Sequence, residues 1–282
     1  MGIEGDFMNV EFTTNDYLLA WYLLFKPSFC EEMQNLKVKL YKNYGKQYMS
    51  LEKENVEILK YNDDFIPDDD TVYNIVFESD IFQKIKKETD KHRIFLMKLW
   101  DTNQKKIKSL FKEITRTHVK DDFTIIVIHP KLDTIEFIET NPKKNISWGK
   151  NDDVENENQT LMRILYTITK YELGTFHKEN REIVSSIIDL AITNELQTRF
   201  VGTSKYSEGF KSLRTLKKHL YPYFLMYLGA VDKEDLVSYM MRDKIAFDID
   251  KIRIEKDLKE IDLYGFIDFC CKNQKYILKT NN

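Results

Sequence analysis

The sequence predicts a mainly α-helical protein with a small β component. Its 282 residues include only 9 glycines and 5 prolines, which are too few turn formers for a sandwich, a barrel or a disordered tail. Apolar residues recur at three- and four-residue spacing through most of the chain, as they do on the buried face of a helix. The one clear β signal lies at residues 123–138. Since 42% of the residues are hydrophobic, we expect well-filled cores.

The length allows one large domain or two ordinary ones. We predict a mainly helical N-terminal domain with a β-hairpin over residues 1–145, a linker and helical pair over 146–204, and a third domain over 205–282. The first boundary is indicated by a loop-like stretch rich in Asn, Asp and Glu at 141–158, and the second by Gly202-Thr203-Ser204.

Four helices are expected in the N-terminal domain. The first follows a cap near Asn15, is apolar almost all round through Phe25, and is therefore predicted to be buried. A second should run from about residue 28 to 40, and a third from about 71 to 81. The fourth is a long amphipathic helix over 91–117, with its inner-face residues predicted as Ile94, Leu96, Leu99, Ile107, Leu110, Phe111 and Ile114.

The β component is predicted to be a hairpin at residues 123–138. Residues 124–128 are β-branched and apolar, 130–133 have turn composition, and 134–138 alternate between apolar and polar residues. An isolated hairpin is only marginally stable, so it must pack on the helices or pair with another strand. Two further helices are expected at about 159–173 and 178–198.

The third domain begins with a largely apolar helical stretch at 213–228, in which Pro222 is expected to cause a kink or break. Asp232 can cap a short second helix. A third helix is predicted from Ile249 to Tyr264, ended by Gly265 in the position that favours a left-handed residue. Two short strands, 266–269 and 275–278, are then expected to form a β-ribbon.

This order of helices, glycine and β-ribbon over residues 213–279 resembles the winged helix-turn-helix superfamily. The resemblance implies that the third helix enters the major groove of double-stranded DNA and that the ribbon, or wing, touches phosphates. The residues implied to meet DNA are Lys251, Arg253, Lys256, Lys259, Lys272 and Lys275. Glu255 and Asp257 lie among these cations and would repel phosphate unless they are paired. A winged helix that binds a protein partner therefore stays open as an alternative.

Sites for metals and phosphates have little support in the sequence. The five histidines are scattered, and Cys270-Cys271 lacks the two-residue spacer of a zinc site. His129 is expected to be a packed or capping residue, and the acidic run at 63–70 a solvated turn. No glycine cluster exists to cradle a phosphate. No cofactor is predicted.

A metal-dependent nuclease is the weakest of three functional hypotheses. The predicted hairpin offers Asp133, Glu136 and Glu139, with Lys143-Lys144 just beyond. However, such nucleases place a Glu-x-Lys element after the aspartate, and neither glutamate here is followed by a lysine at that spacing.

Three cysteines and no recognisable signal peptide indicate a reducing, cytoplasmic environment. No apolar run approaches the roughly 18 residues needed to span a bilayer, so no membrane partner is expected. The net charge of −3 means that any nucleic-acid contact must come from a local patch. The leading hypothesis is a non-enzymatic DNA-binding or DNA-associated factor, such as a regulator or a replication, mobile-element or defence accessory. The alternative is an adaptor that binds a protein partner or forms a homodimer.

Overall fold

The computed structural model describes residues 8–117, 119, 121–138, 143–150, 156–174, 177–202, 207–230 and 257–278. These residues are mainly helical with a small four-stranded sheet, so the predicted fold class is confirmed at that level. The chain divides into two compact units, each formed by two separate segments. Unit 1 contains residues 1–102 and 120–155, and unit 2 contains residues 103–119 and 156–282. Within the described ranges, no helix has the length and apolar character to cross a membrane.

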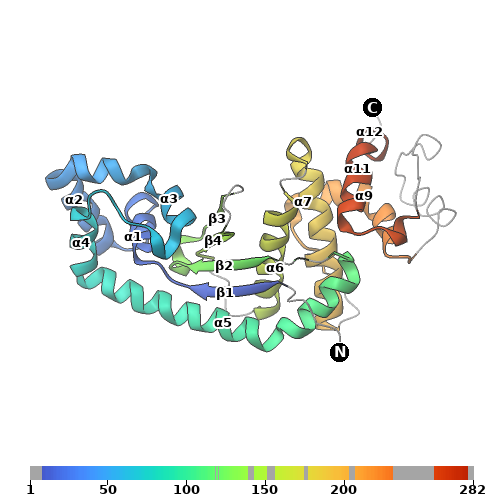
Figure 1. Cartoon of the computed structure of the whole chain (residues 1–282), viewed down its shortest axis with the longest axis horizontal. Helices are drawn as coiled ribbons and strands as arrows, with labels where there is room; N and C mark the ends of the chain where they lie inside the picture. The colour runs from blue at the N-terminus through green and yellow to red at the C-terminus, as the bar shows by residue number, and fades with distance from the viewer. Residues whose placement is uncertain are drawn as a thin grey trace. The chain divides into compact units, whose positions relative to one another are not determined.

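The sheet of unit 1 has the order β1-β2-β4-β3. Its strands are β1 (Asn9–Thr13), β2 (Asp122–Val127), β3 (Ile135–Phe137) and β4 (Asn145–Trp148). β2 lies between β1 and β4 and is parallel to both, while β3 pairs with β4 in the antiparallel sense. The strands can be followed in Figure 1.

The predicted hairpin at 123–138 is therefore wrong in its pairing, although both of its strands exist. β4 lies between β2 and β3 and comes from the segment predicted to be a loop. β2 carries buried side chains on both of its faces, which suits a strand enclosed between parallel neighbours. β1, near the N-terminus, was not predicted.

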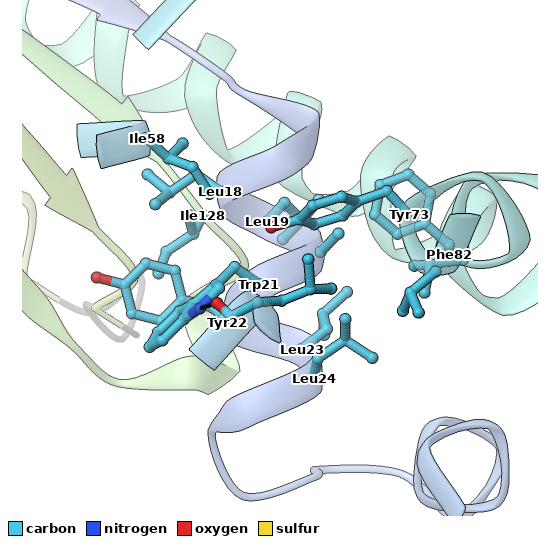
Figure 2. Close-up of a cluster of buried hydrophobic side chains, with 14 of the residues drawn as sticks. Leu18, Leu19, Trp21, Tyr22, Leu23, Leu24, Ile58, Tyr73, Phe82 and Ile128 are labelled. Carbon is cyan, nitrogen blue, oxygen red and sulfur yellow. Dashed lines mark hydrogen bonds between the residues drawn. The ribbon is translucent and has the colours of Figure 1, made fainter. Parts of the chain in front are cut away.

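The core of unit 1 is built around α1 (Asp16–Phe25). The Asn15 side chain caps this helix by accepting a hydrogen bond of 2.9 Å from the Leu18 amide. Every residue from Leu18 to Leu24 is buried, which confirms the prediction of a helix that is apolar almost all round. Figure 2 shows these side chains pointing in several directions, toward residues of other elements: Ile58, Tyr73, Phe82 and Ile128.

Four further helices surround α1. They are α2 (Glu31–Ser50), α3 (Glu54–Tyr61), α4 (Thr71–Glu78) and α5 (Asp80–Thr115). α2 contains a kink at Tyr44, where the backbone leaves the helical region. α5 begins at Asp80 rather than at the predicted residue 91, and it contributes residues 80–102 to unit 1 and its remaining residues to unit 2.

The described residues of unit 2 form helices joined by turns and loops, with no strand among them. Its elements after α5 are α6 (Glu157–Leu173), α7 (Arg181–Asp189), a π-helix (Leu190–Leu196), α8 (Gln197–Val201), α9 (Arg214–Tyr227), α11 (Leu263–Lys272) and α12 (Gln274–Ile277), with short 3₁₀ turns between some of them. The helical pair expected at 159–173 and 178–198 is confirmed. The helix expected at 213–228 is confirmed as α9, which contains Pro222.

The predicted wing is wrong, because 266–269 lies in helix α11 and 275–277 in helix α12. The Asp262 side chain accepts a hydrogen bond of 2.9 Å from the Gly265 amide, which caps α11 and places the glycine in its first turn. Phe266, Ile267, Cys270 and Cys271 are buried, and this spacing is helical. The winged-helix arrangement is thus not confirmed.

The predicted third helix, 249–264, is only partly within the described residues. Of its described residues, Leu258–Glu260 form a 3₁₀ turn, Ile261 has extended backbone, and Leu263 and Tyr264 already belong to α11. Residues 231–256, which include the predicted second helix, lie outside the described ranges.

Candidate nucleic-acid interface

The six cations predicted to meet DNA fall into two groups. Lys251, Arg253 and Lys256 lie outside the described residues. Of the others, Lys259 and Lys272 each pair with a nearby carboxylate, and Lys275 lies over a tyrosine ring. The ion pairs are Lys259–Asp257 at 3.0 Å and Lys272–Asp268 at 2.6 Å, and Lys275 Nζ is 5.1 Å from the Tyr276 ring centre. Carboxylates thus neutralise two of the three described cations.

A denser group of cations lies on α5. Lysine recurs there at seven-residue spacing, at positions 84, 91, 98, 105 and 112. Seven residues are almost two helical turns, and a straight helix drifts by only about 20° per seven residues. Lysines at this spacing therefore share one side of the helix. The part in unit 1, with Lys87 added, is called here the lysine face: Lys84, Lys87, Lys91 and Lys98.

The packing of α5 fixes which side of the helix is exposed. Phe82, Ile85, Leu96 and Trp100 are all buried, and they form the inner stripe of an amphipathic helix. The four lysines lie on the opposite side and are exposed. Ile94 lies seven residues after Lys87, on the same side of the helix, and is 38% exposed. The prediction that it belongs to the inner face is therefore wrong.

Charged side chains that lie next to the lysine face on α5 form pairs with groups on other elements. Within the described part of the chain, none of its four lysines forms an ion pair. Lys86 pairs instead with Asp16, and Glu88 pairs with His129 at 3.0 Å. That hydrogen bond is the main cause that lowers the pKa of Glu88, and the charge of nearby Lys84 contributes to the same shift. The face ends near Asp80 and Asp101.

His129 is buried and serves a structural purpose. Its Nδ1 accepts a hydrogen bond of 3.2 Å from the Lys131 amide, and its ring stacks on Phe29 at 4.6 Å. The prediction of a packed, capping histidine is confirmed. Since Nδ1 is an acceptor, Nε2 carries the proton that is donated to Glu88. Burial lowers the pKa of His129 despite the carboxylate.

A pocket with polar walls lies in unit 1. It has a volume of about 570 Å³ and includes Asp63, Asp64, Asp121 and Asp122 in its lining. Lys143 pairs with Asp64, and Lys144 pairs with Asp121 at 2.5 Å. Among the residues that could be searched, no group of three or more His, Cys, Asp or Glu side chains is placed to hold a metal ion.

The carboxylates considered for a nuclease are engaged in separate ion pairs. Asp133 lies 2.6 Å from Lys150. Glu136 lies 2.8 Å from Lys26 and accepts a hydrogen bond of 2.8 Å from the Tyr22 hydroxyl. Glu139 lies outside the described residues. Glu136 therefore joins the sheet to α1, whereas Asp133 joins the segment before β3 to the segment after β4.

No protein-family model, characterised protein or solved structure matches the chain. The function must therefore be argued from the chemistry of the described residues. The sequence analysis does not predict the lysine face, because the apolar stripe is the stronger periodic signal in this helix. The signal that would have revealed it is the seven-residue recurrence of lysine.

Proposed function

We propose that this protein is a non-enzymatic DNA-binding protein and that the phosphate backbone of the duplex contacts the lysine face of α5. The observation that supports the proposal is the set of four exposed lysines, without ion pairs among the described residues, on one side of a rigid helix. The proposal does not depend on Lys251, Arg253 or Lys256, which lie outside the described residues.

The spacing of these charges suits a nucleic-acid backbone. From Lys84 to Lys98 the helix rises by about 21 Å, over which a duplex presents a dense row of phosphates, with about one charge per 1.7 Å. A protein of net charge −3 has no overall attraction for DNA, so binding must come from this local row of cations. Contacts with phosphates give no sequence preference by themselves.

The salt dependence of binding tests the proposal. Four lysines that displace counterions predict a slope of log K against log[salt] of about −3.6, so that affinity falls about 150-fold for a fourfold rise in salt. The measurement is fluorescence anisotropy of a labelled random-sequence duplex. The variant Lys84→Gln/Lys87→Gln/Lys91→Gln/Lys98→Gln should lose most of the binding and most of the slope.

A matched control changes four exposed lysines elsewhere. The control variant is Lys53→Gln/Lys178→Gln/Lys211→Gln/Lys218→Gln, which removes the same charge. It should retain the wild-type slope. Absence of binding at low salt, or equal losses in the two variants, would contradict the proposal.

A protein-binding role for the terminal segment is the second candidate. It is favoured by the carboxylates that neutralise Lys259 and Lys272. The variant Lys259→Glu/Lys272→Glu should then leave duplex affinity unchanged. A loss of affinity comparable to that of the lysine-face variant would instead assign DNA contact to the terminal segment.

A further inference from the structure

Exposed apolar side chains are concentrated in one stretch of unit 1. Nine large hydrophobic residues are exposed among the described residues, and seven of them lie between residues 38 and 66. We call these seven the apolar surface: Val38, Tyr41, Tyr44, Met49, Val56, Tyr61 and Ile66. Ile66 is 84% exposed. Six of the seven lie on α2 and α3, which are joined by only three residues. Exposed apolar residues that gather in one patch mark an interaction site.

The first half of the apolar surface, on α2, is basic. Residues 34–50 include four lysines and no acidic residue. Lys39, Lys42 and Lys46 are exposed, and no ion pair involves them within the described ranges. Val38, which is 58% exposed, lies four residues before Lys42 and therefore on the same side of α2. This half therefore offers exposed apolar atoms beside positive charge.

The second half, on α3 and the turn after it, is acidic and hollowed. A pocket of about 370 Å³ is lined there by Glu54, Glu57, Tyr61, Asp64, Phe65, Ile66 and Asp68. The Glu54 carboxylate accepts a hydrogen bond of 2.8 Å from Tyr73, while Glu57 and Asp68 are exposed. This half therefore offers an apolar floor with a rim of carboxylates.

We propose that the apolar surface binds a second copy of this chain. In the proposed dimer, the basic half on α2 of one copy meets the acidic hollow on α3 of the other, and the reverse contact forms at the same time. A twofold interface needs such a self-complementary surface. Here one chain supplies both halves, each with exposed apolar residues and with opposite charges.

Charge complementarity favours a second copy over a nucleic acid as the occupant. A polyanion would be attracted to Lys39, Lys42 and Lys46 but repelled by Glu57 and Asp68, which belong to the same surface. A net charge of only −3 provides little general repulsion between copies. The inference goes beyond the proposed DNA binding and uses none of the residues of the lysine face.

Two charge-swap variants of the full chain test the interface. One is Lys39→Glu/Lys42→Glu/Lys46→Glu, and the other is Glu57→Lys/Asp68→Lys. Each alone places like charges opposite each other in both contacts and should shift the monomer–dimer equilibrium toward monomer by at least tenfold, as measured by sedimentation velocity over a range of concentrations. Mixed in equal amounts, they should form a heterodimer, because each contact again joins opposite charges.

Recovery in the mixture separates the proposal from simple misfolding, since only folded chains can pair. The control Lys211→Glu/Lys218→Glu changes exposed lysines of unit 2 and should dimerise like the wild type. A wild-type chain that stays monomeric at every concentration would overturn the proposal. So would a dimer that neither swap weakens, or a mixture that fails to pair.

Discussion

The ion pair between Lys217 and Asp189 lets the stability of unit 2 be predicted. The Asp189 side chain is fully buried and that of Lys217 is 7% exposed, with Nζ 2.5 Å from the carboxylate. Lys217 also donates to the Asn194 side chain at 3.0 Å and to the Glu208 carbonyl at 2.6 Å. The Phe210 amide donates to the same carboxylate at 3.0 Å. These bonds join the end of α7, the π-helix, α9 and the segment before it.

The informative change is Lys217→Met, which keeps most of the side-chain volume and removes the charge. It leaves the Asp189 carboxylate buried without its cation. Removing one partner of a buried ion pair costs about 3–5 kcal/mol, whereas removing both charges is often nearly neutral. Lys217→Met should therefore be destabilised by about that amount at neutral pH, and Asp189→Asn/Lys217→Met by clearly less.

The cost should depend on pH in a definite direction. Burial raises the pKa of Asp189 above its ordinary value of 3.8, and the Lys217 ammonium opposes that rise. Without the lysine the pKa rises further. The folded state then binds a proton at a pH where the unfolded chain does not, so the variant gains stability as the pH falls. The gap to wild type should be widest at neutral pH and should narrow toward pH 3.8.

Urea unfolding at several pH values measures these quantities. Since Trp21, Trp100 and Trp148 all belong to unit 1, far-UV circular dichroism is the suitable signal for unit 2. Lys218→Met, at an exposed neighbouring position, is the control and should change stability by less than about 0.5 kcal/mol. The reasoning is refuted if the two variants lose equal stability, or if the loss in Lys217→Met grows on acidification.

Three further predictions concern single residues. Gly209→Ala should be more destabilising in thermal unfolding than Gly202→Ala. Both glycines have positive φ, but only at position 209 would a Cβ lie 2.6–2.8 Å from three side-chain oxygens. Burial lowers the pKa of His92 to about 4, so its stabilising contribution is full above pH 6.5 and is lost as the pH falls to about 4; His92→Gln should flatten that part of the stability–pH curve. Tyr22→Phe removes a hydrogen bond of 2.8 Å to Glu136 and should cost about 1–3 kcal/mol in urea unfolding.

Helices with strong local signals could be predicted from the sequence. α1 has a capping side chain at Asn15, a run of apolar residues and a stop at Pro27. α6 and α9 have long apolar periodicity. In each case the deciding interactions lie within the element, so a local pattern is sufficient.

Strand pairing could not be predicted, because it depends on partners far apart in sequence. β1 meets β2 across more than a hundred residues, and β4 is four residues long within a segment of loop-like composition. All four residues of β4 are buried, but their burial comes from the neighbouring strands and helices rather than from a pattern within the strand. Such tertiary effects routinely override local preference.

The predicted strands near the end of the chain are wrong because the apolar residues there fit both the two-residue period of a strand and the longer period of a helix. Residues 266–269, Phe-Ile-Asp-Phe, suit a short strand if they are considered alone. With Leu263, Cys270 and Cys271 included, the buried positions follow the helical period instead. The hydrogen bond that the Gly265 amide donates to the Asp262 side chain places this glycine in the first turn of α11 rather than after the end of a preceding helix.

The two proposed surfaces make one joint prediction about salt. A monomer with one lysine face should show a slope of about −3.6, and a dimer that places both faces on the same duplex should approach −7.2. The charge-swap variants change the protein's charge in opposite directions. If both variants show a salt slope that has fallen from the wild-type value toward about −3.6, the cause is the loss of the dimer and not the altered charge. If the wild-type dimer itself gives about −3.6, the second copy adds no phosphate contacts, and dimerisation and DNA binding are independent properties of unit 1.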